Sequence, residues 1–122
     1  MKSIRRSVLS VLIITATALW AWDTGDRCLG QWSDGYWYPA TVVNTGEGVY
    51  NVAFDDGDSA ALSDSQIRSI DWNVGSAIEC NWKGGGSYYP GTITKKSGDS
   101  IHMSYDDGDE EDTTIGKCRS RP

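Results

Sequence analysis

Residues 50–58 read YNVAFDDGD and residues 101–109 read IHMSYDDGD, so one pattern occurs twice with an offset of 51 positions. In each copy, large apolar residues alternate with polar or small ones and lead into an Asp-Asp-Gly turn. Alternation with a period of two is typical of a half-buried β-strand, and Asp and Gly suit the backbone of tight turns. Each copy therefore predicts a strand that ends in a turn.

The match between the two copies extends on both sides of this pattern. Trp32 corresponds to Trp82 at an offset of 50, whereas the Tyr-Pro pair at Tyr38 corresponds to the pair at Tyr89 at an offset of 51. One inserted residue in the glycine run at residues 84–86 accounts for the change of offset. So many ordered matches with a single gap indicate an internal duplication.

Each repeat is expected to form a small all-β domain, the first over residues 22–71 and the second over residues 72–122. Turns rich in Gly and Asp divide each repeat into about five short strands. Five such strands are too few for a two-layer sandwich, whereas closing the sheet into a small barrel removes its exposed edges. A barrel of this size is marginally stable alone. Because no linker of distinct composition separates the repeats, we expect them to pack together.

The first 21 residues differ from the rest and resemble an export signal. Three basic residues lie among the first six positions, and residues 8–21 form an apolar run of 14 residues. A membrane-spanning helix needs about 20. We therefore expect a signal peptide helix over residues 1–21 and an exported protein, periplasmic or extracellular. The alternative is an uncleaved anchor, in which case alone the chain would contact a membrane.

The charge of the chain restricts its partners. Residues 1–21 contain three basic residues and no acidic ones, so their removal changes the net charge from −6 to −9. Nucleic acid binding depends on Lys and Arg that displace counterions from phosphates, so we expect no nucleic acid partner. Anionic membrane surfaces are disfavoured for the same reason. The charge favours cationic partners.

The residue sets on which common enzymes depend are missing from the sequence. One histidine and three cysteines occur, without the spacing of a metal site. Residues 106–112 contain six acidic residues but not the alternating ligands of a calcium loop, so a solvated acidic loop is favoured over a weak calcium site. Neither a nucleophile–histidine–acid set nor a phosphate-binding loop is present. We expect no enzymatic activity, no cofactor and no metal.

Aromatic and acidic residues recur at equivalent points of the two repeats, where strand ends and turns meet at one rim of a small barrel. Aromatic faces attract cations, and a carboxylate adds charge and accepts hydrogen bonds from N–H groups. The candidate ligand-binding residues are Trp32, Tyr38, Phe54, Asp56 and Asp58 in the first repeat, and Trp82, Tyr89, Tyr105, Asp107 and Asp109 in the second.

These motifs resemble the Tudor/Agenet domains of the Tudor "royal" superfamily. The matching segments are WSDGYWYPA at 32–40 and YNVAFDDGD at 50–58, then Trp82, YYPG at 88–91 and HMSYDDGD at 102–109. The resemblance covers nearly all of residues 22–121 and implies two five-stranded SH3-like barrels in tandem, each with an aromatic cage for methylated lysine or arginine at the candidate positions. Many cages of this family have a further aromatic residue where this sequence has Asp58 and Asp109. Both cages are therefore expected to be more acidic and more open.

The resemblance also implies a disulfide. In barrels of this type the first and last strands are neighbours, and Cys80 and Cys118 lie on the first and last strands expected for the second repeat. We therefore expect a Cys80–Cys118 bridge, which an exported protein can keep. Cys28 is then left over, either buried or available to link two chains.

The sequence thus predicts a non-enzymatic binding module that recognises a cationic group on a peptide, a protein segment or a small ammonium ligand. The acidic turns favour mono- or dimethylated ammonium, or guanidinium, over a quaternary group. The alternative is a structural or assembly scaffold of two packed barrels without a small-ligand pocket. Trp37 and Tyr88 lie on the opposite strand face from Tyr38 and Tyr89. We expect these two residues between the domains.

Overall fold

The computed structural model of the protein describes residues 22–122. The signal peptide helix and the alternative membrane anchor expected at residues 1–21 lie outside the described residues. Over residues 22–122, no helix is long and apolar enough to cross a membrane.

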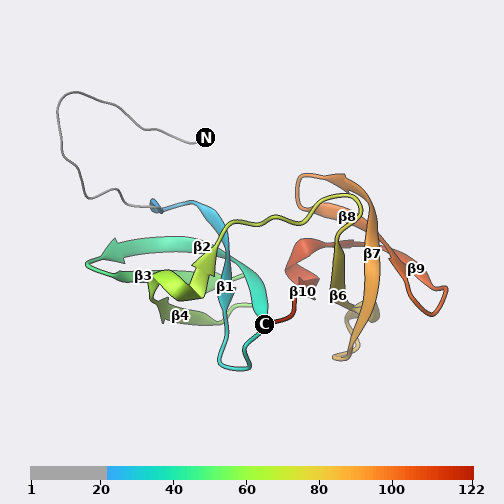
Figure 1. The fold of residues 1–122 in the computed structure, drawn as a ribbon, viewed down its shortest axis with the longest axis horizontal. Helices are drawn as coiled ribbons and strands as arrows, with labels where there is room; N and C mark the ends of the chain where they lie inside the picture. Colours follow the sequence, from blue (N-terminus) through green and yellow to red (C-terminus); the bar gives the residue numbers. More distant parts are fainter. Residues whose placement is uncertain (1–21) are drawn as a thin grey trace.

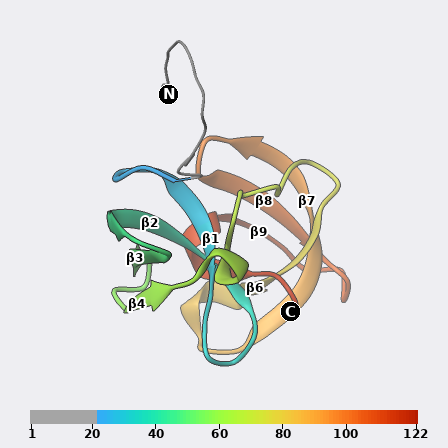
Figure 2. The same cartoon turned by 60° about the vertical axis from the view of Figure 1, so that its left-hand side comes forward.

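The two repeats form two five-stranded antiparallel sheets that curl around separate cores (Figures 1 and 2). The first sheet has the order β4-β3-β2-β1-β5 and consists of β1 (Arg27–Gln31), β2 (Trp37–Gly46), β3 (Val49–Phe54), β4 (Ser59–Leu62) and β5 (Ile67–Arg68). The second has the order β10-β6-β7-β8-β9 and consists of β6 (Ala77–Asn81), β7 (Tyr88–Ser97), β8 (Ser100–Tyr105), β9 (Glu110–Thr114) and β10 (Cys118–Arg119). The expected all-β architecture with five strands per repeat is confirmed.

Short 3₁₀ turns complete the chain trace: η2 (Asp64–Gln66), η3 (Trp82–Gly84) and η4 (Ile115–Lys117). The long strands β2 and β7 both shift register once, between Val42 and Asn44 and between Ile93 and Lys95. A bulge bends a strand and increases its twist. The two equivalent bulges therefore help each sheet curl over its core.

The alternating pattern of residues 50–58 and 101–109 places every second residue of β3 and β8 in a core. At most 5% of each of these side chains is exposed: Tyr50, Val52, Phe54, Ile101, Met103 and Tyr105. Burying one large apolar side chain contributes about 1.5–3 kcal/mol. The period-two prediction for these strands is confirmed, and their last residues, Phe54 and Tyr105, reach the rim where the candidate sites lie.

The outer face of β1 and β2 is also apolar, and the second repeat covers it. Strand residues alternate between faces, so Cys28 lies in the first core whereas its neighbour Leu29 faces outward. Leu29 is 0% exposed and Trp37 is 7% exposed, and both belong to the apolar cluster of the second repeat. The first repeat thus contributes two large side chains to its neighbour's core.

Polar contacts fix this docking. The backbone N–H and C=O of Trp37 pair with those of Ser120 at 3.0 Å in both directions, and Figure 1 shows the segment after β10 returning to the first sheet. The Arg68 guanidinium lies 4.1 Å from the centroid of the Trp37 ring. The expectation that Trp37 lies between the domains is confirmed.

A close backbone approach adds to the interface. A Cβ at Gly116, in η4, would lie 2.9 Å from Oδ2 of Asp55. Real Cβ atoms do not come so near a carboxylate without displacing it. Glycine at this position therefore permits the two domains to approach each other at the end of β3.

The disulfide implied by the resemblance is present. Cys80 and Cys118 are register partners on β6 and β10, and they form a bridge with a sequence separation of 38 residues. In the chain-entropy account, closing a loop of that length stabilises the fold by about 4 kcal/mol. Both half-cystines are 0% exposed.

The third cysteine, Cys28, is buried in the first core and 0% exposed. This decides between the two alternatives for the leftover thiol, because a buried sulfur cannot link two folded chains. Burial raises the pKa of the Cys28 thiol to about 12. The reactive form of a cysteine is the thiolate, so this thiol is unreactive near neutral pH.

We expect a colorimetric disulfide reagent to label no thiol in the folded, oxidised protein at pH 8. The same reagent should label one thiol after unfolding in urea without reductant, and three after reduction. Rapid labelling of the folded chain, or a disulfide-linked dimer on a non-reducing gel, would show that Cys28 is accessible.

Candidate functional site

Three aromatic side chains of the first repeat converge at the rim of its sheet. Trp32 follows β1, Tyr38 lies on β2 and Phe54 ends β3. The ring centroids of Trp32 and Phe54 are 5.4 Å apart at an interplanar angle of 84°, and those of Tyr38 and Phe54 are 6.4 Å apart at 90°. Edge-to-face pairs of this kind stabilise one another. All three rings line one cavity.

The turn after β3 places carboxylates beside these rings. The Asp58 N–H donates to Oδ1 of Asp56 at 3.0 Å, and the Phe54 N–H donates to the Asp58 carbonyl at 2.8 Å. Gly57 between them has φ +100°, a conformation that side chains rarely adopt. The Asp-Asp-Gly-Asp motif thus forms a fixed turn that presents two carboxylates at the rim.

A third carboxylate, Asp34, belongs to the loop between β1 and β2. The Tyr38 hydroxyl donates to Oδ2 of Asp34 at 2.6 Å, and the Tyr36 N–H donates to Oδ1 at 2.9 Å. Burial, and then the hydrogen bond to Asp34, raises the pKa of Tyr38 to about 12. The phenol is therefore neutral at physiological pH and holds Asp34 in place.

The second repeat closes the site from the opposite side. The Tyr88 ring, on β7, lies 6.3 Å from the Tyr38 ring at an interplanar angle of 80°. The Arg119 guanidinium lies 3.9 Å from the Tyr36 centroid and 4.1 Å from the Tyr88 centroid, and donates to the Tyr38 hydroxyl at 3.2 Å. The second repeat therefore supplies a fourth aromatic wall.

The result is a composite cavity of about 130 Å³, which we name the first cage. Its lining residues are Trp32, Asp34, Tyr38, Phe54, Asp56, Asp58 and Tyr88. The structure thus brings together all five candidate residues of the first repeat. A neighbouring groove of about 600 Å³ shares Asp56 and Tyr88 with the cage and continues between the domains along Asp55, Asn81, Thr114, Gly116 and Lys117.

The corresponding residues of the second repeat are arranged differently. Trp82 and Tyr105 form the same edge-to-face pair, with centroids 5.5 Å apart at 89°, and Asp107 and Asp109 form the same turn. Tyr89, however, is 44% exposed. Among the described residues it stacks on neither Trp82 nor Tyr105. The structure therefore brings four of the five candidate positions of this repeat together.

Lys83 and Glu111 lie at the aromatic site formed by Trp82 and Tyr105, which we name the second site. Neither residue was among the candidates from the sequence. The Lys83 ammonium lies 4.9 Å from the centroid of the Trp82 ring. Glu111, on β9, accepts hydrogen bonds from the Tyr105 hydroxyl at 2.6 Å and from the backbone N–H of Lys83 at 3.2 Å. Lys83 has φ +50°, a left-handed conformation that favours glycine. The chain's own cation is thus held against Trp82.

Four residues lie at these two sites but were not predicted as site residues from the sequence: Asp34, Tyr88, Lys83 and Glu111. Asp34 lies in an ordinary Ser-Asp-Gly turn, and turn chemistry alone accounts for such a residue. Tyr88 was expected between the domains, but its contact with Tyr38 depends on how the repeats dock. In the first repeat Ser33 and Ala60 stand at the positions of Lys83 and Glu111. These two differences between the repeats are the one sequence signal that could have indicated that the two aromatic sites differ.

Comparison with known proteins agrees with this architecture. Residues 25–70 match the family model of the DNA repair protein Crb2 Tudor domain. The crystal structure of Crb2 tandem tudor domains is similar with a TM-score of 0.63 and 16% sequence identity, and the match covers 85% of this chain and 83% of that chain. At this identity the structural likeness shows the fold. Among curated protein sequences, none matches. The expected tandem Tudor-like arrangement is confirmed.

We expect the ε-methylene protons of Lys83 to resonate upfield of those of the other lysines, because they lie over the face of the Trp82 ring. Two-dimensional NMR of the ligand-free protein measures this directly. Replacement of Trp82 by Leu should remove the shift, and Trp32→Leu, the matched change in the first repeat, should leave it intact. Random-coil shifts for Lys83 in the wild-type protein would show that the second site is not occupied by this lysine.

Proposed function

We propose that the two tandem Tudor-like domains form a non-enzymatic binding module whose first cage accepts a methylated ammonium group of a basic protein segment. Tudor domains are generally protein-binding modules, and the match to such a domain over residues 25–70 supports this class of function. The observation that carries the proposal is the convergence of four aromatic rings and three carboxylates on one cavity of about 130 Å³.

The chemistry of this lining selects for a particular cation. A cation over an aromatic face gains about 0.5–2 kcal/mol, and methyl groups reduce the cost of desolvating the ammonium. Asp34, Asp56 and Asp58 add negative charge and can accept a hydrogen bond from a remaining N–H group. A mono- or dimethylated ammonium satisfies both requirements. A quaternary ammonium offers no N–H group to these carboxylates.

The groove beside the first cage provides room for the chain that carries the cation. It shares Asp56 and Tyr88 with the cage and runs between the two domains. The net charge of −9 for residues 22–122 attracts basic segments over longer distances. A peptide ligand with flanking residues is therefore favoured over a free small molecule, although a small ammonium compound shares the same cage chemistry.

In this proposal the two repeats have different roles. The first repeat binds, because its cage is a cavity of about 130 Å³ whose lining does not include Arg119, although this arginine contacts Tyr38 and Tyr88. The second repeat supplies the Tyr88 wall, and its own site is occupied by Lys83. One molecule should therefore bind one cation of this kind.

The alternative function is a structural or assembly scaffold in which the aromatics only stabilise the fold. Its supporting observation is the burial of Phe54, which is 5% exposed and packs on both Trp32 and Tyr38. Against it, Trp32 and Tyr38 are only partly buried and line an open cavity. The two functions predict different results when Trp32 is shortened.

We further propose that the protein is exported. The basic and apolar pattern of residues 1–21 and the Cys80–Cys118 disulfide both support an oxidising compartment. The ligand would then be a basic segment of another exported protein rather than an intracellular one.

Replacement of Trp32 by Ala should weaken binding of a dimethyl-lysine peptide about ten-fold or more, because one cation–aromatic contact of up to about 2 kcal/mol is lost. NMR titration that follows the indole N–H of each Trp measures the affinity and locates the ligand. Trp82→Ala is the matched control and should leave the affinity within about two-fold, since the second site is occupied by Lys83. Circular dichroism should show that both variants remain folded.

The same titration with unmodified, mono-, di- and trimethylated lysine peptides tests the selectivity. The mono- and dimethylated forms should bind most tightly. Equal affinity across all four forms would contradict recognition by the cage. Unfolding of Trp32→Ala, together with the absence of binding to the wild-type protein, would favour the scaffold.

A further inference from the structure

The first repeat holds an arginine of its own in a defined cradle. Arg27, at the start of β1, donates from Nη1 and Nη2 to the two carboxylate oxygens of Asp55 at 2.6 and 2.9 Å. Nη1 also lies 3.2 Å from the Ala40 carbonyl oxygen and 3.2 Å from Oγ1 of Thr41. Nη2 lies 3.2 Å from Oδ2 of Asp99, which the second repeat contributes. A carboxylate that accepts both prongs of a guanidinium, with a carbonyl and a hydroxyl beside it, is a specific arginine site.

The second repeat retains the part of this cradle that the first repeat itself supplies, without the arginine and without a counterpart of Asp99 in the cavity lining. The strand register pairs Ala77 with Thr92 as it pairs Arg27 with Thr41. Gly91 and Asp106 likewise stand at the positions of Ala40 and Asp55. The carboxylate, the hydroxyl and the backbone carbonyl are therefore retained, whereas Ala77 has replaced the cation that they hold in the first repeat.

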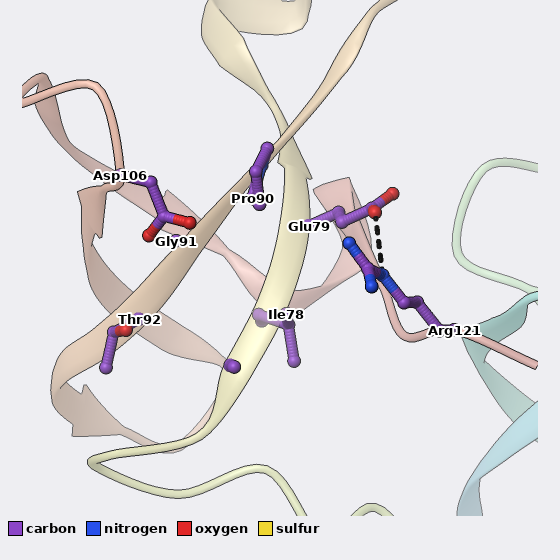
Figure 3. Close-up of a pocket in the computed structure, with 8 residues that line it drawn as sticks. Ile78, Glu79, Pro90, Gly91, Thr92, Asp106 and Arg121 are labelled. Carbon is purple, nitrogen blue, oxygen red and sulfur yellow. Dashed lines mark ion pairs between the residues drawn. The ribbon is translucent and has the colours of Figure 1, made fainter.

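A cavity of about 290 Å³ lies at this position, and its lining includes Ala77, Gly91, Thr92 and Asp106. Figure 3 shows Asp106 and Thr92 on one side of it and the ion pair of Glu79 and Arg121 on the other. Among the described residues, the Asp106 carboxylate takes part in no hydrogen bond or ion pair. The surface is open, because Ala77 and Pro90 are both exposed.

We propose that this cavity is a further binding site, separate from the first cage and from the aromatic site at Trp82, and that it accepts an arginine side chain of a partner protein. The guanidinium would take both oxygens of Asp106 and lie beside the Thr92 hydroxyl and the Gly91 carbonyl, as Arg27 does in the first repeat. Glu79 contributes a second carboxylate to the lining. Because Arg presents two parallel N–H donors and Lys does not, the site discriminates between these cations.

The chain's own Arg121 is the competing occupant. It also lines the cavity, but its Nε lies 3.5 Å from Oε2 of Glu79, and the side chain is 76% exposed. In the structure it thus pairs with the carboxylate on the far side of the cavity from Asp106. An external arginine can therefore bind Asp106 without displacing an existing contact of that carboxylate.

The test uses the blocked amino acid N-acetyl-arginine methylamide as the probe, with the 15N-labelled, oxidised full-length protein in low salt. Saturable shifts should centre on the amides of Ala77, Thr92 and Asp106. The corresponding lysine derivative should bind at least about five-fold more weakly. Asp106→Asn should weaken arginine binding about ten-fold or more. Asp71→Asn, which removes the same charge at an exposed residue outside the cavity lining, should leave it within about two-fold.

Ala77→Arg is the most informative variant. It gives the second repeat an arginine at the position that Arg27 occupies in the first repeat. The added side chain should occupy the cavity and abolish binding of the probe. Unchanged probe affinity in Ala77→Arg, or equal losses in Asp106→Asn and Asp71→Asn, would overturn the proposal. So would binding that appears only after Arg121→Ala, since the chain's own Arg121 would then be the occupant. None of these outcomes depends on the first cage, whose affinity for methylated lysine is measured separately.

Discussion

The burial of the outer face of β1 and β2 is the interaction on which the other features depend. Leu29 and Trp37 project from the first sheet, and the first repeat has no second layer to cover them. The second repeat covers both side chains, and exposing them again would cost about 1.5–3 kcal/mol each. Domains of about 50 residues are marginal alone. The docking of the repeats therefore stabilises the fold, and it also places Tyr88 beside Tyr38 and so completes the first cage.

The duplicated sequence produces two domains with different surfaces because a few positions have diverged. Leu29 in the first repeat corresponds to Glu79 in the second, where the carboxylate pairs with Arg119 and Arg121. The outer face of the second sheet is therefore polar at the position where the first sheet presents Leu29 to its neighbour. The same divergence opens the second repeat's cradle at Ala77 and fills its aromatic site with Lys83.

Much of the fold could be predicted from the sequence, because it follows from local patterns. The period-two alternation predicts β3 and β8, the turns rich in Gly and Asp predict about five strands in each repeat, and the repeat offsets predict two equivalent domains. The family resemblance implied the Cys80–Cys118 disulfide. The convergence of the aromatic residues of the first repeat was also expected. The contribution of Tyr88 to that cage could not be derived, because it depends on docking between residues far apart in the chain. The occupation of the second site by Lys83 depends on a left-handed backbone conformation that no sequence period indicates.

The central claim is that the two domains dock in solution and share one composite site. The most direct measurement is a nuclear Overhauser spectrum of the aromatic protons in the ligand-free, oxidised protein. Docked domains should give cross-peaks between the Tyr38 and Tyr88 rings, whose centroids are 6.3 Å apart in an edge-to-face arrangement, and a single rotational correlation time for both domains. The absence of these cross-peaks, together with independent tumbling of the two repeats, would contradict that claim.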